Sequence, residues 1–468
     1  MFPAAAVSGS LTELISASTG PLAPDWTAWA EILAFGAPLA GRTPFAGICR
    51  LQPGEQVAPQ PDDAAVAGPG SARTRPVIRQ QGWSWMDVEP EQGLRPEDLS
   101  GQLLEALRDQ IRAWAGSGPL HPMLSGGRDS RLLSMMAVQA RPESLTAWTT
   151  SSDTGTSMEE LVAARVASAL GMEHRIVPAE HARFPQDVQD YARTVDYMAS
   201  FHMWLMPVSR ALRQAREESC MGTVLDGLGG GVFLGGGFPD DPALTEQIPS
   251  SARLLDSRFA RMGRYLDAAD EVLAPGVGEE LRERARADFE QVAAPLADHP
   301  NGATLTAYLT RTLPGISVAP AKVLGSAQPT RMPIMADEVI TQALRVPHSA
   351  KEEGLWYRDL LRKTDARIAE LPTAAELTKR RQHVRRISSR ESAEWLRELI
   401  LGSPAGELLS DTLRQAPSED WAEHLAKTKP QHLIRGLAML ALWLEEHGDR
   451  LTSTQPPFTR SPQGVGSA

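Results

Sequence analysis

A short, mainly apolar segment runs directly into a glycine-rich loop and then into a helix, and this feature most constrains the fold of the chain. Residues 120–124 precede the loop, residues 125–130 read Ser-Gly-Gly-Arg-Asp-Ser, and helical apolar spacing begins at Arg131. A strand, loop and helix in this order present consecutive backbone N–H groups and a helix N-terminus to one point, where glycine lets an anion approach closely. The sequence therefore predicts a phosphate-binding loop at 125–130.

The loop also indicates which phosphate chemistry it serves. Asp129 would repel phosphate unless it holds a Mg²⁺ ion that bridges the phosphates. The chain has no G-x-x-x-x-G-K-[ST] run, and a loop without that lysine favours release of whole pyrophosphate over transfer of the terminal phosphoryl group. We therefore predict Mg²⁺ as a cofactor and release of pyrophosphate by cleavage at an α-phosphorus. The alternative, a glycine turn with a serine cap, is disfavoured because six positions and their strand–helix context agree.

Strands alternate with helices beyond this loop. Residues 145–150, 175–177 and 223–226 are predicted strands, and residues 159–170 are a predicted helix. The last strand leads into a second glycine loop at 227–231. This alternation predicts an α/β fold with a parallel sheet, whose ligands lie beyond the carboxyl ends of the strands. Both glycine loops stand at such ends.

The flanking segments differ from this region. At 468 residues the chain fits two domains with a shorter third piece. Residues 55–76 are rich in Pro, Ala and Gly without apolar periodicity, which predicts a linker or a surface excursion. Apolar spacing predicts a helix with Ser100 as its N-cap and a mainly helical chain from residue 240 onward. The composition of residues 451–468 predicts a disordered tail.

Composition excludes several classes of protein. The chain has 42% hydrophobic and 22% charged residues, no apolar run of about 18 residues and no secretory start, so we expect a cytoplasmic protein with no membrane partner. Two cysteines, Cys49 and Cys220, exclude a disulfide framework and a four-cysteine zinc site. A formal net charge of −11 argues against a nucleic-acid partner, and the basic run at 379–386 is interpreted as a solvated helix face.

Three segments together resemble the asparagine-synthetase C-terminal domain, a member of the ATP pyrophosphatase group. They read Leu124-Ser125-Gly126-Gly127-Arg128-Asp129-Ser130, Asp226-Gly227-Leu228-Gly229-Gly230-Gly231-Val232-Phe233-Leu234-Gly235-Gly236 and Met332-Pro333-Ile334-Met335-Ala336-Asp337. The resemblance implies a parallel-sheet, adenine nucleotide α-hydrolase-like domain with a mostly helical C-terminal part. In this family ATP adenylates a carboxylate, and an amine then attacks the acyl-adenylate, giving an amide, AMP and pyrophosphate. Relatives include asparagine synthetases, β-lactam synthetases and the macrolactam cyclases of lasso peptides.

Carried over residue by residue, the resemblance implies a nucleotide site. Leu124 and Thr149 would contact the adenosine, and Gly227 would lie against the nucleotide, with a simple turn glycine as the alternative. Asp129 becomes the Mg²⁺ ligand. The implied pyrophosphate cradle consists of Ser125, Gly126, Gly127 and Ser130. Lys379 or Arg380 stands where the family places a lysine that would stabilise the oxyanion during amine attack; the alternative is an exposed basic helix.

The second loop departs from the family. The family's second loop carries an aspartate that shares the Mg²⁺, followed by a glutamate, and here those positions are Gly231 and Val232. Leu228 occupies the place of an acidic residue near the reaction centre. Asp226 is a candidate second metal ligand, with a turn or cap residue as the alternative. These losses remove charge from a metal-dependent site, so weakened or absent catalysis is the competing expectation.

The N-terminal segment also departs from the family. Asparagine synthetases begin with a glutaminase domain whose nucleophilic cysteine follows the initiator methionine, and here that residue is Phe2. Residues 26–55 resemble only the last part of that domain, so we expect no glutamine hydrolysis and an amine that is free ammonia or part of the substrate. The implied divisions are a remnant at 1–55, a linker at 56–97, the ATP pyrophosphatase domain at 98–385, a helical extension at 386–450 and the tail at 451–468.

Three functions follow from these observations. The first is an AMP-forming amide synthetase without glutaminase activity, with a peptide macrolactam cyclase acting on a precursor peptide as one form. The second is a nucleotide-binding pseudoenzyme that serves as a partner subunit in a natural-product pathway. The third is a different ATP pyrophosphatase, such as a tRNA-thiolating enzyme or NAD synthetase. Distant cysteines and the net negative charge disfavour the tRNA-thiolating enzyme.

Overall fold

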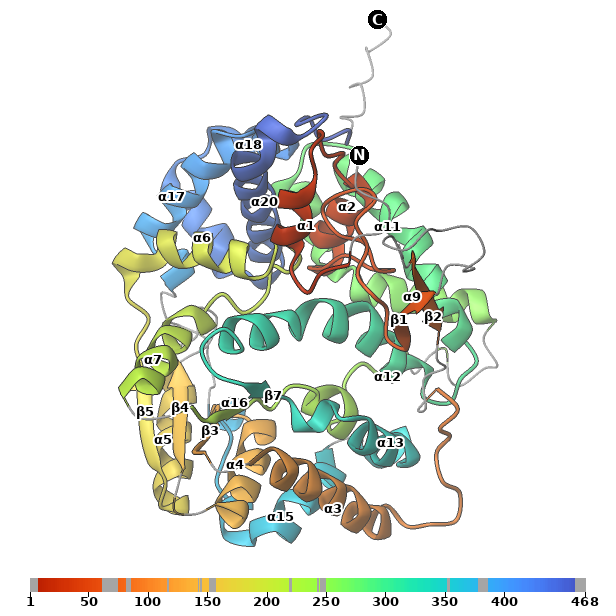
Figure 1. The fold of residues 1–468 in the computed structure, drawn as a ribbon, viewed down its shortest axis with the longest axis vertical. Helices are drawn as coiled ribbons and strands as arrows, with labels where there is room; N and C mark the ends of the chain where they lie inside the picture. The colour runs from red at the N-terminus through yellow and green to blue at the C-terminus, as the bar shows by residue number, and fades with distance from the viewer. Residues whose placement is uncertain are drawn as a thin grey trace, which may run out of the picture.

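The computed structural model describes most of the chain. The described residues are 7–60, 75–80, 86–115, 118–141, 143, 145–150, 157–218, 221–241, 244, 250–351, 354–377 and 386–458. Helices surround a small sheet, and the first and last helices of the chain lie together at one end of the molecule (Figure 1). Among the described residues, none of the helices combines the length and apolar character needed to cross a membrane.

All strand pairs of the central sheet are parallel. The strands are β3 (Leu120–Pro122), β4 (Thr146–Thr150), β5 (Glu173–Val177), β6 (Thr223–Leu225) and β7 (Thr330–Arg331). The ladders run β3-β6-β7 and β4-β5, and bridges from Leu120 to Leu145 and from Met123 to Trp148 join β3 to β4. The spatial order is therefore β5-β4-β3-β6-β7. The predicted parallel α/β sheet is confirmed.

This strand order contains a switch point between β3 and β6. From β3 the chain moves outward to β4 and β5, and then returns to place β6 on the other side of β3. Ligands of parallel sheets bind beyond the carboxyl ends of the strands at such a point. The two glycine loops follow these two strands, so both lie at the switch point.

One apolar core lies around the sheet. It is built by α3 (Pro96–Ala115), α4 (Arg128–Ala140), α5 (Ser157–Leu170), α13 (Asp337–Arg345) and α15 (Leu355–Ala369). Its buried members include Leu107, Leu133, Val166, Phe233 and Leu360. In α3 the apolar residues recur at helical spacing, which turns one face of the helix toward α4 and α15.

A second core joins segments from both ends of the chain. Helix α2 (Trp26–Phe35) packs against α11 (Val277–Ala293) and α20 (Thr428–His447), near α17 (Arg390–Leu401) (Figure 1). The Trp443 ring lies 5.1 Å from the Trp29 ring and 5.2 Å from the Phe45 ring, measured between centroids. The predicted divisions of the chain stay predictions, but residues from the first and last of the folded segments share this core.

The remaining elements are mostly short. The helices are α1 (Leu11–Ala17), α6 (Phe184–Thr194), α7 (Leu205–Glu218), α9 (Ser251–Met262), α10 (Ala269–Val272), α12 (Gly302–Ala307), α14 (His348–Lys351), α16 (Ala374–Leu377), α18 (Asp411–Gln415) and α19 (Ser418–Ala426). Wider π-helical turns occur at Gly230–Leu234, Tyr308–Ile316 and Pro320–Leu324. Turns of this kind are frequent at functional sites.

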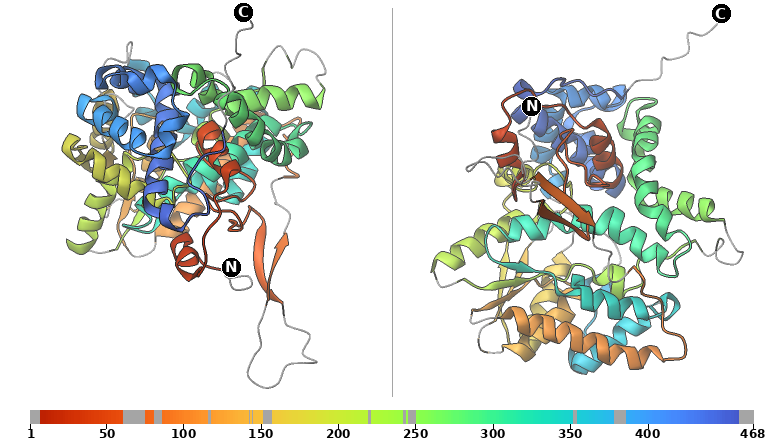
Figure 2. Two further views of the ribbon diagram at one scale, coloured as in Figure 1. Left: turned by 90° about the horizontal axis from the view of Figure 1, so that it is seen from above. Right: turned by 45° about the vertical axis from the view of Figure 1, so that its right-hand side comes forward.

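Two local predictions differ from the structure, and a third segment agrees with one of its two alternatives, a surface excursion. Ser100 is not an N-cap, because α3 begins at Pro96 and the Ser100 hydroxyl lies inside the helix, 3.0 Å from the Pro96 carbonyl oxygen. The predicted linker contains an antiparallel hairpin of β1 (Glu55–Gln60) and β2 (Arg75–Gln80), which lies at the edge of the molecule (Figure 2). The predicted tail is ordered as far as residue 458, because Phe458 is buried against Trp26. Residues 459–468 lie outside the described part.

Candidate functional site

The first glycine loop is anchored by the strands on either side of it. The backbone N–H of Met123 donates to Leu225 O at 2.8 Å, and that of Leu124 donates to Trp148 O at the same distance. The hydroxyl of Thr149 donates to Leu124 O at 2.6 Å and lies 2.8 Å from Nε2 of His174. Leu124 and Thr149, the two predicted adenosine contacts, therefore lie together at the carboxyl ends of β3 and β4.

The N–H groups of this loop have internal acceptors. The Ser125 N–H donates to the Ser130 hydroxyl at 3.0 Å, the Gly127 N–H to the Ser125 hydroxyl at 3.2 Å, and the Gly126 N–H to Glu159 at 2.8 Å. Glu159 stands in the first turn of α5. The loop thus has the shape of an anion cradle, but a bound phosphate would have to replace these acceptors. Rotating the exposed Ser125 hydroxyl away costs little, since water can satisfy it.

The two glycine loops pack directly against each other. A Cβ atom on Gly227 would lie 2.9 Å from the Ser130 nitrogen and 3.2 Å from the Asp129 Cβ. A Cβ atom on Gly230 would collide with the Asp129 carboxyl group. Only glycine allows this approach, so both positions are required by the packing of the second loop on the first. Gly227 is therefore more than a turn residue, although its contact with a nucleotide stays a prediction.

Asp129 is held at the centre of this contact. Its Oδ1 atom accepts a 2.5 Å hydrogen bond from the Tyr357 hydroxyl, and the Gly231 backbone N–H also donates to the carboxylate. Burial raises the pKa of Asp129, while the bonds from Tyr357 and Gly231 and the charge of Arg128 oppose that rise. Because Tyr357 is buried on α15, it fixes the orientation of the carboxylate.

Asp226 stands just past β6, close enough for its charge to interact with that of Asp129. Its Oδ1 atom accepts a 2.9 Å hydrogen bond from the Leu228 N–H. Burial and, to a smaller extent, the negative charge of Asp129 together raise the pKa of Asp226 to about 6, although the hydrogen bond from the Leu228 N–H opposes that rise. The structure therefore brings together the two predicted metal ligands.

The carboxylate pair fits a magnesium ion delivered with a nucleotide. Two neighbouring carboxylates, of which Asp129 raises the pKa of Asp226, are stabilised by a divalent cation between them. In the part of the chain that the structure describes, no group of three or more His, Cys, Asp or Glu side chains could hold a metal unaided. Mg²⁺ is commonly bound by one or two carboxylates together with phosphate oxygens and water. Asp129 and Asp226 supply that number.

The three departures from the family pattern occupy different environments. Gly231 is exposed, and a Cβ atom placed there meets nothing within 4 Å. Val232 is buried in the core around the sheet. Leu228 packs against a small cluster of Phe201, Tyr265 and Ile316. Among these three positions, 231 has open space for an added side chain, and its backbone N–H contacts Asp129.

Two predicted site residues lie outside the described residues, and two residues of the site were not predicted from the sequence. Lys379 and Arg380, the predicted catalytic residues, lie outside the described residues, so their placement stays a prediction. Sequence reasoning missed Tyr357 and Glu159. Glu159 begins a predicted helix, a signal that was available, whereas Tyr357 is 228 residues from Asp129 and carries no motif.

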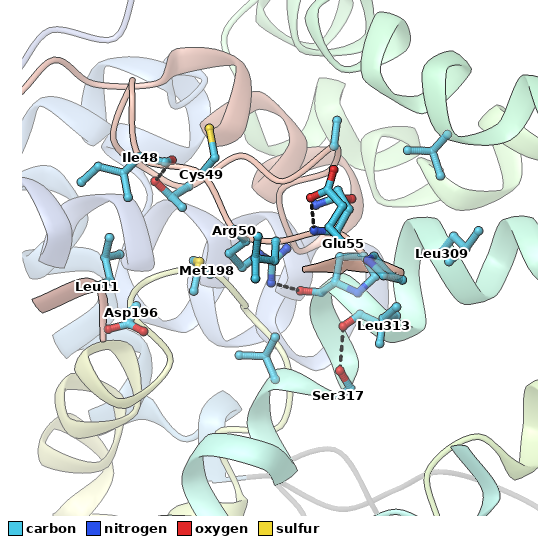
Figure 3. Close-up of a pocket in the computed structure, with 18 of the residues that line it drawn as sticks. Leu11, Ile48, Cys49, Arg50, Glu55, Asp196, Met198, Leu309, Leu313 and Ser317 are labelled. Atoms are coloured by element: carbon cyan, nitrogen blue, oxygen red, sulfur yellow. Dashed lines mark hydrogen bonds between the residues drawn. The ribbon is translucent and has the colours of Figure 1, made fainter. Parts of the chain in front are cut away.

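A cavity of about 1300 Å³ is lined in part by Ile48, Arg50 and Leu313 (Figure 3). The N-terminal segment and the π-helical turns at 308–324 line it, and no residue of either glycine loop does. The Arg50 guanidinium donates to Pro314 O at 3.2 Å and to Pro38 O at 3.3 Å, and burial lowers its pKa to about 10 (Figure 3). This cavity lacks the phosphate-binding geometry of the switch point.

The parallel sheet, its switch point and the two facing glycine loops define an α/β protein whose ligand site lies at the carboxyl ends of the strands. A model of the asparagine synthase family matches residues 99–445. The chain belongs to this family, which confirms the resemblance read from the sequence motifs.

The matches to individual solved structures are weak. No curated protein matches the chain. Among solved structures, NMN synthetase from Francisella tularensis is 18% identical with a TM-score of 0.23, and the match covers 31% of this chain and 58% of that chain. The NH3-dependent NAD synthetase from Campylobacter jejuni subsp. jejuni is 13% identical with a TM-score of 0.20, and the match covers 42% of this chain and 96% of that chain. The chain thus spans little more than half of the first of these structures, and family membership rests on the family model.

Proposed function

We propose that this chain is an amide synthetase that uses ATP to adenylate a carboxylate and forms AMP and pyrophosphate. The observation that carries the proposal is the contact between the two glycine loops at the switch point, with Asp129 between them and Asp226 beside it. A site of this shape presents N–H groups to phosphates and carboxylates to their counter-ion.

Each part of the site has a role in this proposal. Leu124 and Thr149 border the adenosine, and Gly227 lets the nucleotide lie close to the backbone. The cradle of Ser125, Gly126, Gly127 and Ser130 holds the pyrophosphate, aided by the N-terminus of α4. Asp129 and Asp226 would hold Mg²⁺, which, when bound, neutralises charge on the departing pyrophosphate.

The reaction proceeds in two steps. An oxygen of the substrate carboxylate attacks the α-phosphorus, the bond to the bridging oxygen breaks, and pyrophosphate leaves. The amine nitrogen then attacks the acyl carbon, the bond to the AMP oxygen breaks, and the nitrogen loses a proton to solvent. Lys379 or Arg380 is proposed to stabilise the oxyanion of this second step by its positive charge.

The source of the amine is part of the proposal. We propose that ammonia or an amino group of the substrate itself attacks the acyl-adenylate, without glutamine hydrolysis by this chain. A peptide whose own amine and carboxylate join into a macrolactam is one such substrate. Ammonia release from glutamine at background level supports this proposal, whereas release that Cys49→Ser abolishes contradicts it.

A nucleotide-binding pseudoenzyme is the second candidate. Gly231, Val232 and Leu228 favour it, because they replace three acidic groups that the family pattern carries. Such a protein would bind Mg·ATP without turnover and would act through a partner protein.

The products of ATP distinguish the two candidates. With ATP labelled at the α-phosphorus and a panel of carboxylates and amines, a synthetase yields labelled AMP only when a carboxylate is present. Labelled ADP as the product would contradict cleavage at the α-phosphorus. Retained ATP binding with no product across the panel would favour the pseudoenzyme.

A further inference from the structure

A group of aromatic and cationic side chains borders the reaction centre. Phe201, Tyr265 and Ile316 form a buried cluster against which Leu228 of the second loop packs. The Arg311 guanidinium lies 5.6 Å from the centre of the Phe201 ring and 5.2 Å from that of Phe238. The group therefore connects Leu228 of the second glycine loop to Arg311 through the Phe201 ring.

Tyr265 is the centre of this group. Its ring stacks on His432 with 3.7 Å between centroids, and its hydroxyl lies 3.5 Å from Nη2 of Arg311. The Arg264 guanidinium lies 5.5 Å from the centre of the same ring. Arg435 reaches His432 from the other side, with Nη2 2.8 Å from Nδ1. Three guanidinium groups thus surround one stacked tyrosine–histidine pair.

The charge of this group is positive. Among the described residues, neither Arg264 nor Arg311 forms an ion pair with a carboxylate. Burial and the nearby arginines lower the pKa of His202 to about 3 and that of His432 well below its ordinary value. Both histidines are therefore neutral at pH 7, and the positive charge comes from the arginines.

This group is reachable from the carboxyl edge of the sheet. Thr150, the last residue of β4, donates to Trp204 O at 3.0 Å, and the Trp204 ring lies 4.6 Å from the His202 ring. Trp204, Leu228 and Arg311 are all partly exposed. A molecule that extends from the switch point past Leu228 would meet Arg311.

We propose that Arg311, with Tyr265 beside it, binds a carboxylate of the acyl substrate other than the carboxyl group that is activated. A guanidinium offers a planar fork of donors that matches a carboxylate, and an apolar surround strengthens the attraction. Leu228 supports this assignment, because an acidic side chain there would repel a second anionic group. The identity of the bound group as substrate rests on the proposed function, whereas its binding to Arg311 is tested without ATP.

Tyr265 provides a spectroscopic reporter for this site. The chain has five tyrosines. Burial raises the pKa of Tyr191, Tyr197, Tyr308 and Tyr357, whereas Arg311 and Arg264 outweigh burial and lower the pKa of Tyr265. The first phenolate absorbance that develops on raising the pH therefore belongs to Tyr265, and Tyr265→Phe should remove it.

The test is a tyrosine titration of the full chain in glutarate, with chloride at equal ionic strength as the reference. A bound carboxylate disfavours the nearby phenolate, so glutarate should raise the first midpoint by about one pH unit relative to chloride. Equal midpoints in glutarate and chloride would overturn the proposal. A rise in inorganic phosphate but not in glutarate would also overturn it, because the site would then select a phosphate group.

Two variants show whether the shift of the titration midpoint comes from binding at Arg311 or from a general effect of salt. Arg311→Gln should raise the first midpoint in chloride and abolish the further rise in glutarate, whereas Arg253→Gln, an exposed arginine on α9, should leave both unchanged. If Arg311→Gln keeps the full glutarate response, Arg311 is not the binding group. If the parent protein does not bind Mg·ATP, the proposed function is refuted but carboxylate binding at Arg311 is not, because these titrations contain no nucleotide.

Discussion

The hydroxyl of Tyr357 on α15 donates a 2.5 Å hydrogen bond to Oδ1 of Asp129, 228 residues earlier in the chain. This bond ties the first glycine loop to a helix on which none of the sequence motifs falls. A hydrogen bond to a charged acceptor is stronger than one between neutral groups, and it fixes the direction in which the carboxylate points. Tyr357 is thus a positioning residue for the predicted metal ligand.

Tyr357→Phe should destabilise the protein. Removing the hydroxyl leaves a buried carboxylate with one donor fewer, which costs about 1–3 kcal/mol in the free energy of unfolding. Urea denaturation at pH 7 measures this loss. A stability equal to that of the parent would mean that the bond does not form in solution.

Gly231→Asp should increase pyrophosphate release if the chain is a weakened synthetase. The position is open, and its backbone already donates to Asp129, so an added carboxylate stands beside the predicted Mg²⁺ site. Gly231→Asn, which has the same shape without the charge, is the matched control. Equal release by the Asp and Asn variants would show that the missing charge does not limit turnover.

Asp226→Asn should lower carboxylate-dependent pyrophosphate release at least about tenfold, which is roughly 1.4 kcal/mol of activation free energy. Asp226 lies close enough for Asp129 to raise its pKa, and the asparagine keeps the shape of the side chain. Unchanged pyrophosphate release would mean that Asp226 is only a turn residue whose carboxylate accepts a hydrogen bond from the Leu228 N–H.

Lys351→Met should stabilise the protein, most strongly at low pH. Lys351 is buried, and burial lowers its pKa from 10.5 to about 7. Between these values the unfolded chain binds more protons than the folded one, so the stability contributed by this residue rises with pH. Below pH 7 the folded protein carries a buried ammonium at full cost.

The expected gain for Lys351→Met is therefore on the order of a few kcal/mol below pH 7, and it should shrink as the pH approaches 10. Part of the gain is offset because Ala343 O loses its 2.6 Å donor. Lys429→Met, at an exposed lysine paired with Asp267, should show no such dependence. A gain that does not vary with pH would contradict the lowered pKa of Lys351.

The sequence predicted the parts of the site that depend on local order. The strand before Ser125 and the helix after the loop follow from spacing, although the helix begins at Arg128 and not at the predicted Arg131. The close approach at Gly227 and Gly230 follows from backbone sterics. The parallel sheet followed from the alternation of strands and helices. The resemblance then identified the family, which the family model confirms.

The features that the sequence did not predict depend on contacts between distant segments of the chain. Tyr357 and Arg311 take their surroundings from helices far along the chain, and no periodicity or motif reveals such contacts. Phe458 is ordered because Trp26 lies beside it, although its local composition is that of a tail. Ser100 resembled a cap, but its hydroxyl bonds inside a helix that starts earlier.

Calorimetric titration with Mg·ATP tests the central claim most directly, using the parent chain and Asp129→Asn. The parent should bind at millimolar nucleotide or below, since its loop has the shape of an anion cradle and Asp129 and Asp226 lie close together. Asp129→Asn should bind more weakly by one or more kcal/mol, because a metal carboxylate is lost. No binding by a folded parent chain, or equal binding by both proteins, would contradict the assignment of the loop as a Mg·ATP site.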